Sequence, residues 1–121
     1  MRAPEYLEFL CTPLFERTRK GVLTDDDVKV LEDALLENPD LGAVVRQTGG
    51  VRKARAAQEG PGKSGSARVA YLYVRVQQTI YFVCAFSKND QENLTAGQKQ
   101  LIRRLVWEIE KEEWPRKRPV S

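Results

Sequence analysis

The chain has 121 residues, with 20 Lys and Arg, 17 Asp and Glu, and no histidine. A length near 120 residues is typical of a single domain, which buries roughly two thirds of its unfolded surface. The lack of histidine in this chain excludes a Ser-His-Asp triad, a Cys-His pair and any metal site with histidine ligands. General acid–base catalysis would therefore depend on Lys, Arg, Tyr, Asp, Glu or Cys.

The two cysteines, Cys11 and Cys84, are far apart in sequence and both lie in apolar runs. They form no CxxC motif and are too few for a metal cluster, so we expect two free buried thiols. Such thiols are typical of a reducing compartment. The sequence contains no apolar run of about 18 residues and no N-terminal signal pattern, which predicts a cytoplasmic protein without membrane contact.

The net charge of +3 is an average over segments of opposite sign. Residues 1–45 carry 5 basic and 10 acidic residues, whereas residues 46–107 carry 11 basic and 3 acidic residues. Residues 108–121 are balanced, with 4 of each. The excess of positive charge in the middle segment favours a polyanionic partner, such as RNA, DNA or an acidic protein, over a merely solvated surface.

In chain order, the first elements predicted are a short strand over Tyr6–Cys11 and a short helix over Leu14–Val22. Thr24 then begins a second helix, because its hydroxyl can cap the helix and three aspartates follow at the positive end of the dipole. Apolar residues at helical spacing continue this helix until Asn38-Pro39 ends it.

The next predicted elements are a turn at Thr48–Gly50, a strand over Val51–Ala57 and a glycine-rich loop over Gln58–Ser66. We expect this strand to pair antiparallel with the strand that follows the loop. Ala57–Ser64 also nearly fits the phosphate-binding pattern GxxxxGK[ST]. That pattern requires a helix directly after it, and a strand pattern follows here, so we predict no nucleotide cofactor.

The residues Arg68–Val76 and Ile80–Lys88 predict a β-hairpin, because they are rich in Val, Tyr, Phe and Ile. A three-residue loop centred on Gln78 would place Arg68 opposite Lys88, about 5 Å apart at Cβ. In this register one face is wholly apolar and forms the core side, with Ala70, Leu72, Val74 and Val76 opposite Phe86, Cys84, Phe82 and Ile80. The same register places Tyr71, Tyr73 and Tyr81 on the other face, where packing or plain exposure is favoured over base stacking.

Thr95–Gln98 has the pattern of a capping box and begins the last predicted helix, which ends at Trp114-Pro115. Its apolar stripe consists of Leu101, Ile102, Leu105, Val106 and Ile109. We predict one domain over 1–115 and a flexible basic tail over 116–121. The predicted fold is α+β: a small antiparallel sheet of three to four strands, two N-terminal helices and one C-terminal helix, packed on one side.

Several of the basic residues fall where they can form one cluster. Lys53 and Arg55 share one side of their strand, while Arg52 lies on the other, and either of the pair can approach Arg68 and Lys88. Solvated strand edges would be the simplest explanation. Like charges directly opposite each other destabilise a sheet, however, and this favours an anionic ligand.

A histidine-free ribonuclease could use such a cluster. The RNA's own 2′-OH would attack the adjacent phosphate, and an arginine fork would stabilise the charge that develops on it. A lysine crowded by arginines loses its proton more readily and could transfer protons. None of these roles requires a metal.

Four segments in order resemble a known family: 48–55 (TGGVRKAR), the Gly62–Gly65 loop, 66–71 (SARVAY) and 86–95 (FSKNDQENLT). Together they resemble the HigB branch of the RelE superfamily, toxins of bacterial type II toxin–antitoxin systems. The resemblance covers roughly residues 5–112 and agrees with the predicted fold. It implies cleavage of mRNA in the ribosomal A site without a metal or other cofactor, and neutralisation by a HigA-like helix-turn-helix antitoxin.

The resemblance also implies site residues. Lys53 and Arg55 match the basic strand pair of the family's active site, and Arg68 and Lys88 match basic residues at the start and end of the next two strands. Arg68 would stabilise the phosphate, and Lys88 or Lys53 would transfer protons.

Contacts with the RNA would come from three further residues, which are Arg52, Lys63 and Asn89. The chain has Asn89 where RelE has a second arginine, and Leu94-Thr95 where RelE has a tyrosine. A lysine would therefore carry more of the proton transfer than in RelE. The alternative is a non-catalytic RNA- or antitoxin-binding module, such as a degraded toxin or an RNA-binding regulator.

Overall fold

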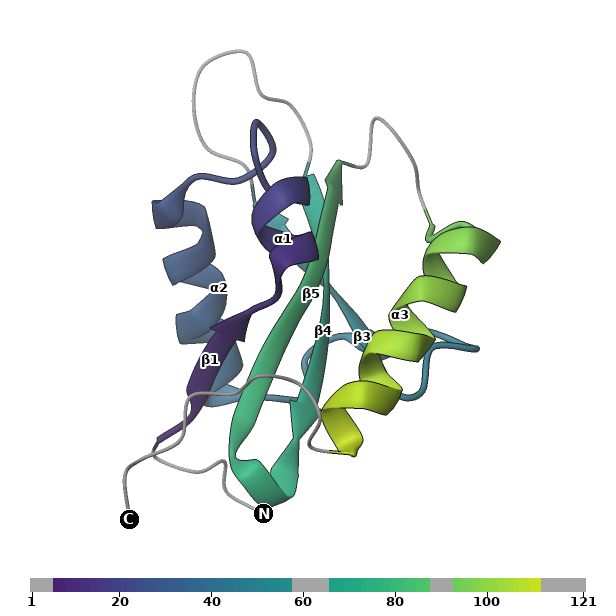
Figure 1. The fold of residues 1–121 in the computed structure, drawn as a ribbon. Coiled ribbons are helices and arrows are strands. Elements are labelled where there is room, and N and C mark those ends of the chain that lie inside the picture. Colours follow the sequence, from purple (N-terminus) through teal and green to yellow (C-terminus); the bar gives the residue numbers. More distant parts are fainter. Residues whose placement is uncertain (1–5, 58–65, 88–92, 112–121) are drawn as a thin grey trace.

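The computed structural model describes residues 6–57, 66–87 and 93–111 (Figure 1). They form five strands, three α-helices and one 3-10 turn, so the α+β prediction with two N-terminal helices and one C-terminal helix is confirmed. In chain order these are β1 (Glu8–Cys11), α1 (Pro13–Thr18), α2 (Asp25–Glu37), β2 (Ala43–Val44), β3 (Arg52–Ala57), β4 (Ser66–Val74), the turn Arg75–Gln77, β5 (Thr79–Ser87) and α3 (Ala96–Glu110).

The sheet has the strand order β1-β5-β4-β3-β2 and is mixed rather than purely antiparallel. β1 runs parallel to β5, whereas the pairings from β5 to β2 are all antiparallel, as predicted for β3 and β4. β1 lies within the short first strand predicted over Tyr6–Cys11, and β2 is the strand that the prediction lacked. β2 has only two residues, which is too short for an alternating pattern to reveal it in the sequence.

Helices cover both faces of the sheet, with α1 and α2 on one side and α3 on the other (Figure 1). The prediction that all helices pack on one side is therefore wrong. The physical reason lies in the central strands: every residue of β5 from Thr79 to Phe86 is buried, so both of its faces need cover. Phe15, Leu35 and Phe82 belong to the core beneath α1 and α2, and Ile102 and Val106 to the core beneath α3.

Both N-terminal helices begin at threonine caps. The hydroxyl of Thr12 accepts a hydrogen bond from the Phe15 amide and begins α1, which ends at Thr18, earlier than the predicted Val22. Thr24 and Asp27 form a reciprocal capping box at the start of α2, and Asn38 caps its end. The start and end predicted for this second helix are confirmed.

The predicted capping box of α3 is also present, with Thr95 and Gln98 bonded to each other's backbone amides. Ile102, Val106 and Ile109 of the predicted stripe are buried, whereas the Leu101 side chain is 65% exposed. The predicted end at Trp114-Pro115 and the tail over 116–121 lie outside the described residues. In the part of the chain that the structure describes, no helix has the length and apolarity needed to cross a membrane.

The register of the hairpin differs from the prediction. Arg68 lies opposite Phe86 and not opposite Lys88, so the prediction that these two cations face each other is wrong. The chain turns through a 3-10 turn, Arg75–Gln77, and then Gln78 at a φ of +50°, which gives a longer connection than the assumed three-residue loop.

A β-bulge further along the hairpin inserts Val83 between two paired positions. It reverses which face the residues beyond it occupy. Leu72 lies opposite Tyr81, and Tyr81 packs beneath α3, whereas Phe82 and Ile80 pack beneath α1 and α2. The predicted apolar face is therefore divided between two cores. Val76, at the far end of the predicted apolar face, is 94% exposed and belongs to neither core.

The preference for packing over base stacking is confirmed for the tyrosines of the hairpin. Tyr71 and Tyr81 are fully buried, and Tyr73 is partly buried. They do not share one face, however, because the bulge turns Tyr81 towards α3 while Tyr71 and Tyr73 pack on the side of α1 and α2. No stacking surface for RNA bases forms from these three rings.

Candidate functional site

Two arginines form the centre of the candidate site. Arg55 of β3 and Arg68 of β4 are directly paired in the antiparallel register. Side chains at such positions lie on the same face with Cβ atoms about 4.5–5.5 Å apart. Arg55 is exposed and Arg68 is partly buried. The expected juxtaposition of two cations across neighbouring strands therefore exists, but between Arg55 and Arg68.

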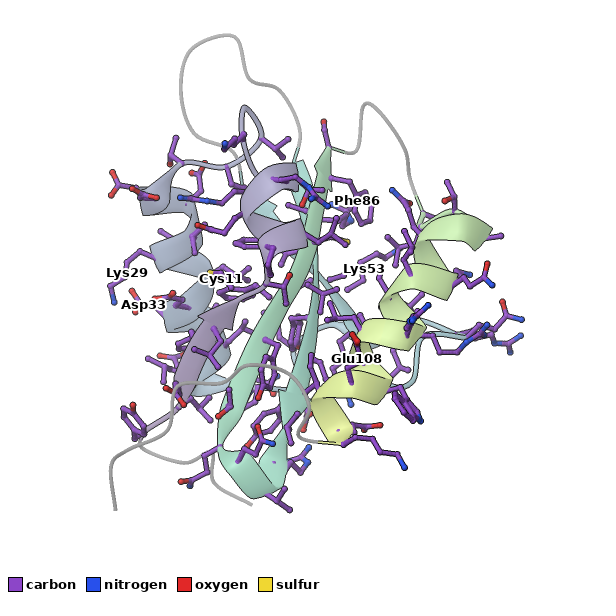
Figure 2. The ribbon with its side chains drawn as sticks, viewed as in Figure 1. Cys11, Lys29, Asp33, Lys53, Phe86 and Glu108 are labelled. Carbon is purple, nitrogen blue, oxygen red and sulfur yellow. The ribbon has the colours of Figure 1, made fainter. Side chains whose placement is uncertain are left out.

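Lys53 lies two residues before Arg55 on the same face of β3. Its Nζ donates a hydrogen bond of 3.0 Å to Oδ1 of Asn93, which precedes the N-cap of α3. Figure 2 shows Lys53 between the sheet and α3. The prediction that Lys53 and Arg55 share one side of their strand is confirmed, and Arg55 is the one of the two that lies opposite Arg68. The predicted approach to Lys88 lies outside the described residues. We call Lys53, Arg55 and Arg68 the cationic cluster.

The strand register gives this cluster a rigid floor. Arg55, Arg68 and Phe86 form one row across β3, β4 and β5, and Lys53, Ala70 and Cys84 form the next. The last residue of each row is buried within the core beneath α3, and Figure 2 shows Phe86 near the end of β5. Residues on paired central strands are held more precisely than residues on loops, so the strand pairing fixes the positions of the Cα and Cβ atoms of the cationic residues.

The thiol of Cys84 lies in the second row, yet it is unsuited to nucleophilic chemistry. Burial raises the pKa of Cys84 from 9.0 to about 12, so its thiol stays protonated near neutral pH. The prediction of a free buried thiol is confirmed for Cys84. It is wrong for Cys11, which is free but exposed because it ends the edge strand β1.

Three of the predicted site residues, Lys63, Lys88 and Asn89, lie outside the described residues. Lys88 directly follows Ser87, which ends β5 and pairs with Ala67 at the start of β4. The roles proposed for these three residues therefore remain predictions.

Arg52 lies on the opposite face of β3 from the cationic cluster, as the alternation of the strand predicts. Its Nη1 donates to the carbonyl oxygen of Gly42 at 2.7 Å and to that of Asp40 at 3.4 Å. Its Nε also lies 3.5 Å from Oδ1 of Asp40. A contact between Arg52 and RNA remains a prediction, but the observed bonds tie this guanidinium to the chain itself.

Asn93 is the member of the site that sequence reasoning missed. Asn93 lies within the segment 86–95 that resembles the family, but its relevance depends on the hydrogen bond from Lys53, which is 40 residues away in sequence. A further signal was its position two residues before the capping box at Thr95. Among the described residues, no group of three or more Cys, Asp or Glu side chains is arranged to hold a metal ion.

Comparison with family models identifies one family. Residues 11–113 match the model described as the RelE toxin of the RelE/RelB toxin–antitoxin system. The match spans every described element from the end of β1 to the end of α3 and includes the whole cationic cluster.

Proposed function

The chain belongs to the RelE toxin family of toxin–antitoxin systems, and from that premise we propose that it is an endoribonuclease that cleaves mRNA on the ribosome. The observation that carries the proposal is the pairing of Arg55 with Arg68 on the face that also bears Lys53. Adjacent cations held on paired strands suit a ligand with closely spaced negative charges, such as an RNA backbone.

In the proposed reaction, the 2′-oxygen of one nucleotide attacks the adjacent phosphorus and loses its proton to the neutral amine form of a lysine side chain. Arg68, assisted by Arg55, binds the non-bridging oxygens and stabilises the negative charge that develops there. The bond from phosphorus to the 5′-oxygen breaks, and that oxygen receives a proton from a second lysine, which is in its protonated form. The products are a 2′,3′-cyclic phosphate and a 5′-hydroxyl end, and no metal takes part.

Lys53 and Lys88 are the candidates for the two proton transfers. Lys53 is supported by its place beside the arginine pair and by its bond to Asn93, which directs its Nζ towards the start of α3. Lys63 and Asn89 are proposed as contacts with the RNA backbone. We further propose a cytoplasmic protein of the HigB branch that is neutralised by a HigA-like helix-turn-helix antitoxin.

A reconstituted assay tests the activity. Purified protein is incubated with a labelled mRNA, either alone or on ribosomes stalled with an empty A site. We expect cleavage only on the ribosome, with 2′,3′-cyclic phosphate ends on the products. Intact mRNA under both conditions, together with retained antitoxin binding, would instead support a non-catalytic RNA- or antitoxin-binding module.

A further inference from the structure

The loop that connects α2 to β2 lies directly against the backbone of Lys53. Gly42 and Lys53 are in such close contact that a Cβ atom on Gly42 would lie 2.3 Å from the Lys53 carbonyl oxygen. The next residue, Ala43, pairs with Lys53 in the sheet. Any displacement of this loop would therefore act on the backbone of Lys53.

Tyr71 holds the loop from beneath. Its buried hydroxyl donates to the carbonyl oxygen of Pro39 at 2.9 Å and accepts a hydrogen bond from the Gly42 amide at 3.1 Å. Burial raises the pKa of Tyr71, so the phenol keeps the proton that this bond to Pro39 requires. One hydroxyl thus links the backbone of Pro39 to the backbone of Gly42.

Arg52 holds the same loop from β3. Its guanidinium bonds the Gly42 carbonyl oxygen and lies beside the Asp40 carboxylate, which Arg75 also contacts. Gly42 is therefore fixed at both polar atoms of its backbone, by Tyr71 at the nitrogen and by Arg52 at the oxygen.

We propose that Tyr71 and Arg52 are positioning residues for Lys53, which act through Gly42 on the strand that carries the cationic cluster. This inference rests on the proposed function, since it assigns a catalytic task to Lys53. Neither residue belongs to the cationic cluster: Tyr71 is buried, and the Arg52 side chain lies on the opposite face of β3. They keep the Lys53 ammonium group in place for proton transfer, where a misplacement of about 1 Å can cost about 10²-fold in rate.

The test compares two substitutions of the same kind. Tyr71→Phe removes the hydroxyl that bonds the loop at Pro39 and Gly42. Tyr81→Phe removes a hydroxyl that donates a hydrogen bond to Oε1 of Gln77 at the hairpin turn. Cleavage on the ribosome is measured at a temperature where both variants are fully folded. We expect Tyr71→Phe to lower kcat by about 10- to 100-fold with KM within about twofold, and Tyr81→Phe to leave both within about twofold.

Arg52→Lys gives a second readout, because it keeps the charge but cannot bond Gly42 and Asp40 with one planar fork. A fall in kcat with unchanged KM supports positioning, whereas a rise in KM alone means that Arg52 contacts the RNA and overturns its assignment. Amide hydrogen exchange at Gly42 and Lys53 is expected to accelerate in Tyr71→Phe but not in Tyr81→Phe.

A third comparison places Tyr71→Phe in a Lys53→Gln background, where its effect on cleavage is expected to disappear. Equal loss of activity in Tyr71→Phe and Tyr81→Phe, or an undiminished effect without Lys53, would overturn the inference. If the wild-type protein cleaves mRNA and Tyr71→Phe has the same kcat, only the positioning role is refuted. A wild-type protein that cleaves no mRNA refutes the proposed function and the inference together.

Discussion

Arg55 and Arg68 face each other directly across β3 and β4. Like charges at such a position cost a sheet a few tenths of a kcal/mol or more, relative to a neutral pair. Lys53 adds a third cation on the same face, over a floor of buried residues. The proposed function accounts for this arrangement, because the phosphate groups of RNA would offset the repulsion between the cations.

The first prediction concerns Arg68. Arg68→Ala is expected to lower mRNA cleavage by about 10²- to 10³-fold, because one fixed donor to the reacting phosphate is lost. The fold should persist, since the side chain is only partly buried at the end of the core. The measurement is cleavage of ribosome-bound mRNA, with circular dichroism to verify folding. Lys29→Ala, on the exposed face of α2, is the control, and equal activity of the two variants would contradict this role.

The second prediction concerns anion binding by the pair. Inorganic phosphate should raise the melting temperature of the wild-type protein, because a ligand that binds only the folded state stabilises it by mass action. The increase should shrink in Arg55→Gln and in Arg68→Ala, and it should persist in Lys29→Ala. A phosphate effect of equal size in all four proteins would show that the anion binds elsewhere or acts nonspecifically.

The third prediction concerns alkaline pH. Burial raises the pKa of Cys84 to about 12, above the ordinary value of 9.0. The unfolded protein therefore releases this proton at a lower pH than the folded protein does. The associated stability is fully present at neutral pH and is lost as pH rises from about 9 towards 12. Urea unfolding at pH 7 and pH 10.5 should show a smaller loss for Cys84→Ala than for wild type, and an equal loss would refute the assignment.

The fourth prediction separates helix stability from the site. Thr95→Ala and Thr24→Ala each remove a capping box, at a cost of about 1 kcal/mol in the free energy of unfolding. Thr95 follows Asn93 by two residues, and Asn93 accepts the hydrogen bond from Lys53, whereas Thr24 begins α2 on the other face of the sheet. We expect Thr95→Ala to lower cleavage severalfold more than Thr24→Ala at matched stability. If cleavage follows stability alone in both variants, the start of α3 does not organise the site.

Much of the fold follows from local chemistry. The caps at Thr24 and Thr95 and the stop at Asn38 depend on residues close in sequence, and the structure confirms them. The shared face of Lys53 and Arg55 follows from the two-residue period of a strand, which needs no knowledge of the rest of the fold.

The hairpin register could not be predicted in the same way. It depends on the 3-10 turn Arg75–Gln77, on Gln78 after it, and on the bulge at Val83, none of which has a sequence signal as strong as Asn-Gly. The bulge inverts the alternation beyond it, so the residues predicted to share one apolar face are divided between two cores. Because of this register, Arg68 lies opposite Phe86.

The parts of the site that depend on distant segments could not be predicted from the sequence either. The bond from Lys53 to Asn93 and the contact of Gly42 with Lys53 both join residues that the fold alone brings together. Arg52 illustrates the opposite case: its type favours a phosphate contact, but its face of the strand places it against Asp40 and Gly42.

The most direct test maps mRNA 5′ ends in bacterial cells after brief induction of the wild-type protein and of Arg68→Ala. The account predicts new 5′ ends in phase with codons for the wild type, lost when translation initiation is blocked, and absent for Arg68→Ala at equal protein levels. Intact mRNA with unchanged growth on induction of the wild type, or equal cleavage by Arg68→Ala, would contradict it.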